Sequence, residues 1–143
     1  MSIIKQISSR YNIYGKDIPS SKKLIKEITK FSTISIPDDY IKLLNEATEI
    51  KISIEDLKYI MIWGVERCIE MNDAYEIQKY IPESLAIADD GDGNTLIYAT
   101  GEIGFGLYII ALNDLEVDEL QYVASSISDL LINNIGIDII TSY

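Results

Sequence analysis

The sequence predicts a single α+β domain in which helices pack against an antiparallel β-meander. Amphipathic helical patterns occupy the first part of the chain, and short apolar segments separated by Gly- and Asp-rich turns follow from residue 85. A helix-capping pattern comes near the end. The 143 residues, 48% of them apolar, are enough for one core, so we expect residues 1–143 to form one domain.

Two amphipathic helices are expected in the first 50 residues. Residues 20–31 place apolar side chains at positions 24, 25, 28 and 31, which is the spacing of one helical face. Residues 37–47 begin with a proline, whose missing N–H costs nothing in a first helical turn. Asp38 and Asp39 follow it and favour the positive end of the helix dipole.

The next segment combines a possible helix start with a strand and a longer helix. Ser53 and Asp56 have the spacing of a capping box, so one interpretation is that a helix begins there. Residues 59–63 are rich in β-branched and aromatic side chains and predict a strand. Residues 65–80 predict one continuous helix, which Pro82 stops.

Three strands follow in immediate succession. Residues 85–88 and 95–100 flank a turn, residues 89–94, that is rich in Asp and Gly. A second Gly-containing turn, residues 101–104, leads to a strand at 105–112. Consecutive strands with tight turns predict an antiparallel meander.

A final helix is expected at residues 127–134. Ser126 and Asp129 have the spacing of a capping box, and Asn134 and Gly136 suit the end of a helix. This helix would close the core after the meander.

Charge is distributed unevenly along the chain. The net charge is −11, and residues 80–143 contain 11 acidic residues but no Lys or Arg, whereas residues 1–79 are neutral. A surface of one sign repels nucleic-acid phosphates and anionic lipids, and it attracts cationic partners. We therefore expect a basic protein partner, no nucleic acid and no membrane. The alternative is that the acidic surface serves only solubility, although solubility does not require the loss of every Lys and Arg from one half of the chain.

The residues that most enzymes and metal sites need are scarce. The chain has no histidine, so the commonest general base and the commonest zinc ligand are missing. Its single cysteine, Cys68, has apolar neighbours in a helical arrangement and is expected to be buried. We expect no metal, no cofactor and no enzymatic activity. The absence of a secretory pattern and of paired cysteines predicts a cytoplasmic location.

Four short strings resemble, in order and spacing, the SUKH superfamily, which includes the yeast cell-wall assembly regulator (Smi/Knr) and many bacterial toxin-immunity proteins. The strings are Ile36-Pro-Asp-Asp-Tyr40, Trp63-Gly-Val-Glu66, Ile87-Ala-Asp-Asp-Gly91 and Val123-Ala-Ser-Ser-Ile127. Together with Leu130-Leu131 they span residues 36–131, which makes residues 1–35 an N-terminal helical extension.

The resemblance implies a SUKH (Smi/Knr-like) fold, no cofactor, and function through protein binding. In bacterial relatives this implies neutralisation of a toxin, and in fungal relatives regulation of cell-wall glucan synthesis. Since the acidic region predicts a basic partner, immunity against a nuclease-type toxin is the first hypothesis and glucan-synthesis regulation is the second.

The predicted partner-binding surface combines two acidic segments with aromatic anchors. Its acidic members are Asp89, Asp90, Asp92, Asp114, Glu116, Asp118 and Glu119, and its aromatic members are Tyr98, Tyr108 and Tyr122. The role of residues 1–20 stays open, since they suit either a partner-facing extension or a cap over the core.

Three other hypotheses are weaker. Asp90, Asp92 and Asn94 have the spacing of a calcium loop, but its later Gly and Glu positions are occupied by Thr95 and Gly101, so a hairpin turn is favoured. A hydrolase with paired carboxylates lacks any motif that singles out a pair. The glycine-rich residues 101–106 lack a phosphate-binding Lys and predict a turn with a bulge.

Overall fold

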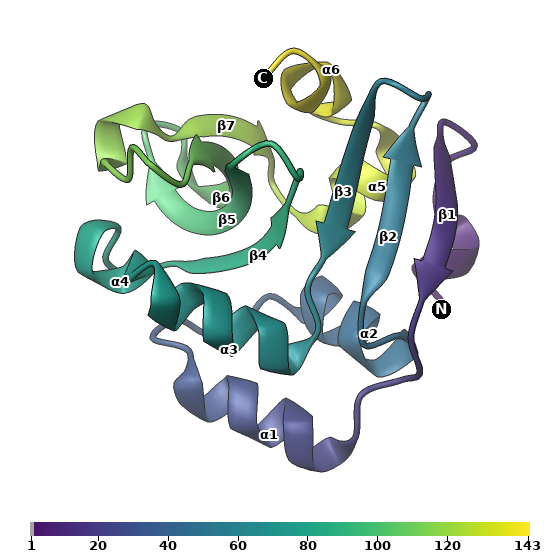
Figure 1. Cartoon of the computed structure of the whole chain (residues 1–143), viewed down its shortest axis with the longest axis horizontal. Coiled ribbons are helices and arrows are strands. Elements are labelled where there is room, and N and C mark those ends of the chain that lie inside the picture. The colour runs from purple at the N-terminus through teal and green to yellow at the C-terminus, as the bar shows by residue number, and fades with distance from the viewer. Residues whose placement is uncertain (1) are drawn as a thin grey trace.

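The computed structural model describes residues 2–143 and shows an α+β fold, in which one seven-stranded antiparallel sheet is packed with six short helices (Figure 1). Met1, the first residue of the expected extension, lies outside the described residues. The strands are β1 Tyr11–Lys16, β2 Ile50–Ile54, β3 Lys58–Ile62, β4 Leu85–Asp89, β5 Asn94–Gly101, β6 Gly104–Ala111 and β7 Gln121–Ala124. The helices are α1 Lys22–Phe31, α2 Asp38–Glu46, α3 Val65–Ala74, α4 Ile77–Tyr80, α5 Ile127–Asn133 and α6 Ile137–Thr141, with short 3-10 turns η1 Ile4–Gln6 and η2 Val117–Glu119.

The strands lie in the sheet in the same order as in the sequence, from β1 to β7. The two central strands, β3 and β4, are paired only at Met61 with Asp89 and at Ile62 with Ala88. Figure 1 shows β1, β2 and β3 side by side, while β4 crosses away from them and β5 to β7 curl behind it. The sheet is therefore one meander made of two half-sheets, β1 to β3 and β4 to β7, and few backbone pairs join them.

Most of the predicted elements are confirmed. The structure contains α1, α2, β3, the meander β4 to β6, and α5 close to the expected residues. Ser126 caps α5, because its hydroxyl accepts a hydrogen bond from the N–H of Asp129 at 3.1 Å. Asn134 and Gly136 both adopt positive φ angles where this helix ends, as expected for C-terminal caps.

The interpretation of Ser53 and Asp56 as a helix start is wrong. Ser53 lies within β2, opposite Tyr59 of β3. Glu55 and Asp56 have φ angles of 48° and 57° and form the tight turn between these strands. The alternating isoleucines of β2 are buried against the core, and this strand pairing outweighs a local capping signal.

The expected continuous helix at residues 65–80 is interrupted. Helix α3 ends at Ala74, and Glu76 adopts a left-handed conformation with φ 50° before α4 begins. The break places Ile77 fully in the core while Tyr75 and Tyr80 remain exposed. No glycine or proline marks this position, so periodicity alone could not locate it.

Strands β1, β2 and β7 and helix α6 were not expected from the sequence. Strand β1 carries Asn12, Gly15 and Lys16, and β7 has only four residues. Such short or polar segments become strands only because a neighbouring strand pairs with their backbone.

The side chain of Asn72 completes the pairing of β4 where β3 no longer covers it. Its amide nitrogen donates to the carbonyl of Ala86 at 2.8 Å, and its oxygen accepts from the N–H of Ala86 at 3.0 Å. The thiol of Cys68 donates to the same carbonyl at 3.2 Å. Cys68 is fully buried, as predicted, and burial raises its pKa to about 12. Helix α3 is thus anchored to β4 by side-chain hydrogen bonds, which replace those that the backbone of a neighbouring strand would make.

We predict that Asn72→Leu destabilises the fold by about 2–3 kcal/mol, because it leaves the buried N–H of Ala86 without an acceptor. Urea unfolding followed by circular dichroism measures the change. Glu70→Ala, an exposed position on the same helix, is the control and should change stability by less than about 0.5 kcal/mol. Equal stability of the two variants would contradict this role for Asn72.

Candidate functional site

Tyr98, expected as an aromatic anchor for a partner, is completely buried. Its hydroxyl donates to the carboxylate of Asp39 at 3.1 Å and accepts from the N–H of Ile127 at 2.8 Å. The same carboxylate also accepts from the N–H of Ser128 at 3.0 Å. Burial is the main cause that raises the pKa of Tyr98. This tyrosine therefore joins α2 to the start of α5 and offers no surface to a partner.

Tyr108 is also inside the molecule. Its hydroxyl donates to the carbonyl of Gly104 at 2.6 Å and accepts from the N–H of Ile103 at 3.2 Å, which closes the turn between β5 and β6. The ring of Tyr122 packs edge-on against it, with ring centroids 5.4 Å apart, and remains half-buried. Of the three predicted anchors, only Tyr122 is accessible to a partner.

The acidic turn between β4 and β5 divides its carboxylates between inside and outside. Asp89 accepts from the indole N–H of Trp63 at 2.7 Å. Asp90 forms an ion pair with Lys58 at 2.9 Å, with side-chain exposures of 1% and 7%. Asp92 is exposed and lies 3.6 Å from the same ammonium group. Asp92 is therefore the member of this turn that a partner can contact most directly.

Asp90 has a structural role, because internal donors surround its carboxylate. Burial alone would raise its pKa, but hydrogen bonds from Asn94, from Lys58 and from the backbone N–H groups of Asp92 and Asn94 outweigh burial and lower the pKa. The segment lies between two strands, as the hairpin interpretation predicted. Between residues 2 and 143, no three His, Cys, Asp or Glu side chains are arranged to hold a metal ion.

The second acidic segment follows β6, and its carboxylates Asp114, Glu116, Asp118 and Glu119 are all exposed. It lies beside the acidic turn, because the N–H of Leu112 donates to the carbonyl of Gly93 at 2.8 Å. The pKa of Tyr143 is raised, first by burial and then by the negative charges of Glu119, Asp114 and Asp90. The fold therefore brings the two predicted acidic segments to one end of the curled half-sheet.

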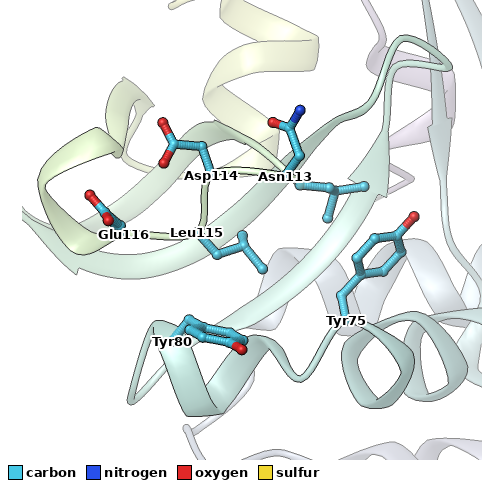
Figure 2. A pocket seen from close by; sticks show the side chains of 7 residues that line it. Tyr75, Tyr80, Asn113, Asp114, Leu115 and Glu116 are labelled. Atoms are coloured by element: carbon cyan, nitrogen blue, oxygen red, sulfur yellow. The ribbon is translucent and has the colours of Figure 1, made fainter.

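An open groove separates the second acidic segment from α4. It has a volume of about 400 Å³ and is lined by Tyr75, Tyr80 and residues 112–116. Figure 2 shows Leu115 pointing toward the tyrosine side, while the carboxylates of Asp114 and Glu116 point outward. A neighbouring hollow of the same size shares Tyr75 and extends to Asp92. The groove has an aromatic and aliphatic interior and an acidic rim.

Sequence reasoning missed Tyr75 and Tyr80 as members of this surface. The sequence places both residues within one continuous helix, and the break at Glu76 directs them to the groove instead. Lys79 is the nearby cation, and it pairs with Glu76 at 3.3 Å. The aromatic side chains that line the groove therefore come from the C-terminal cap of α3 and from α4, and the acidic ones come from the loops of the meander.

Comparison with known families supports the resemblance seen in the sequence. The sequence model described as the SMI1/KNR4 family (SUKH-1) matches residues 19–133, from just before α1 to the end of α5. The matched region includes α1, which lies upstream of the four strings. No curated protein matches the chain.

We predict that the contribution of Asp90 to stability disappears in acid. A carboxyl group whose pKa is lowered on folding stabilises the fold above its unfolded pKa of about 3.9, and this contribution is lost as pH falls through the lower folded pKa. Asp90→Asn should therefore be less stable than the unchanged chain by about 3 kcal/mol above pH 5. The difference should shrink below about pH 4.

Urea unfolding at several pH values between 2.5 and 7 measures this difference. Asp92→Asn is the matched control, because its carboxylate is exposed and farther from Lys58. A difference between the chain and Asp90→Asn that stays constant down to pH 2.5 would show that the ion pair with Lys58 does not stabilise the fold.

Proposed function

The chain belongs to the SMI1/KNR4 family (SUKH-1), which includes immunity proteins and Smi1/Knr4 regulators, and from this premise we propose that it is a non-catalytic immunity protein. It acts in the cytoplasm by binding a basic, nuclease-type toxin. Family membership supports protein binding, and the negative charge of residues 80–143 supports a basic protein as the partner.

The observation that carries this proposal is the acidic half of the sheet. Residues 80–143 contain no Lys or Arg, and they form β4 to β7 with the loops between them, followed by α5 and α6. Asp92, Asp114 and Glu116 are exposed there beside the groove. A surface of this kind steers a basic protein toward it and raises the association rate.

The chemistry of the chain supports binding without catalysis. It contains no histidine, and the buried carboxylate of Asp90 is held by an ion pair and has a lowered pKa. A carboxyl group that acts as a general acid needs the opposite shift. The groove is also open, and the carboxylates of Asp114 and Glu116 at its rim point outward (Figure 2).

The charge also argues against other classes of partner. A half-molecule with carboxylates and no cations repels the phosphates of nucleic acids and of anionic lipids. No helix in residues 2–143 has the length and apolarity needed to cross a membrane. Regulation of cell-wall glucan synthesis through a protein partner is the second function, which family membership alone supports.

We predict that the chain binds a basic toxin encoded beside it, and that raising NaCl from 0.05 to 0.5 M weakens binding by about tenfold or more. Asp114→Lys/Glu116→Lys should weaken binding by about tenfold, because it reverses the charge at the rim of the groove. Isothermal titration calorimetry and protection from toxin activity measure both effects.

The matched control is Glu27→Lys/Glu66→Lys, which changes the net charge equally on exposed positions of α1 and α3. It should retain most of the affinity. Affinity that does not respond to salt, or equal losses in both double variants, would overturn the acidic half as the binding surface. If a pull-down with the chain recovers only a membrane glucan-synthesis complex, the regulatory function is favoured.

A further inference from the structure

We propose that the groove between α4 and the loop after β6 receives an arginine side chain of the partner. This inference rests on the proposed function, from which it takes only that the partner is a protein. It specifies which side chain is recognised and which residues of this chain recognise it.

The interior of the groove offers two partly exposed aromatic rings. Tyr75 and Tyr80 are 42% and 49% exposed, in contrast to the buried Tyr98 and Tyr108. Figure 2 shows Leu115 pointing from the opposite wall toward the side of the groove where the two tyrosines lie. Aromatic and aliphatic walls of this kind suit a long apolar stem.

The rim of the groove is anionic. Asp114 and Glu116 lie on one wall, and the adjoining hollow adds Asp92, while no cation lines either space. The ring of Tyr80 already receives a cation, because the ammonium group of Lys79 lies 5.5 Å from its centroid. Lys79 is largely exposed and is also paired with Glu76, so an incoming cation can replace its ammonium group at the ring of Tyr80.

Arginine fits this combination better than other side chains. Its guanidinium is planar and weakly hydrated, so it stacks on a tyrosine face and forms paired hydrogen bonds to a carboxylate. A lysine ammonium is more strongly hydrated and lacks the planar fork. A neutral apolar side chain would use the walls but not the carboxylates at the rim.

Two capped pentapeptides, Gly-Arg-Gly-Arg-Gly and Gly-Lys-Gly-Lys-Gly, test the proposal against ¹⁵N-labelled protein by NMR titration. The arginine peptide should shift the amides of residues 75–80 and 111–116 and bind about two- to fivefold more tightly than the lysine peptide. Tyr75→Leu/Tyr80→Leu should abolish this preference while leaving the melting temperature unchanged. Tyr14→Leu/Tyr59→Leu is the control, because both rings are 56% exposed and lie outside the groove.

Equal binding of the two peptides, or shifts spread over all the acidic residues, would overturn the arginine site. The same double variants tested against the basic toxin separate this proposal from the proposed function. Toxin binding that survives Tyr75→Leu/Tyr80→Leu would overturn the groove and leave the immunity function standing. Arginine-selective shifts without any toxin binding would support the groove and overturn the immunity function.

Discussion

The strands of this sheet lie side by side in the order in which they occur in the chain. Because of this order, the uneven distribution of charge along the chain becomes an uneven distribution of charge over the sheet. Residues 80–143 contain no Lys or Arg, and they form the half-sheet β4 to β7 and the closing helices α5 and α6. A fold that interleaved early and late strands would have mixed the charges. Because the order is sequential, the acidic residues between 80 and 126 gather in one half of the sheet, and a surface of one sign attracts cationic groups.

The two half-sheets share only a narrow backbone joint, so side chains hold them together. Asn72 replaces a missing strand partner for Ala86, and the indole of Trp63 donates to Asp89. Lys58 of the neutral half forms a buried ion pair with Asp90 of the acidic half. Two carboxylates of the acidic turn, Asp89 and Asp90, are thereby bonded within the fold, and Asp92 remains exposed.

Burial also separates the tyrosines into those inside the core and those at the surface. Tyr98 and Tyr108 fill the core with their hydroxyl groups bonded to Asp39 and to Gly104. The left-handed turn at Glu76 gives the opposite result, since it leaves Tyr75 and Tyr80 at the edge of the groove. The surface that we propose for a partner therefore takes its carboxylates from the meander and its aromatic rings from the helices.

The sequence by itself determined the α+β class, the meander, the capped helix α5 and the segregation of charge, because each depends on neighbours that are close along the chain. Only the tertiary structure decided which acidic and aromatic residues are accessible. Asp90 is buried because Lys58 of another hairpin reaches it, and Tyr98 is buried because α2 and α5 enclose it. Such contacts join residues far apart in sequence, and local periodicity carries no information about them.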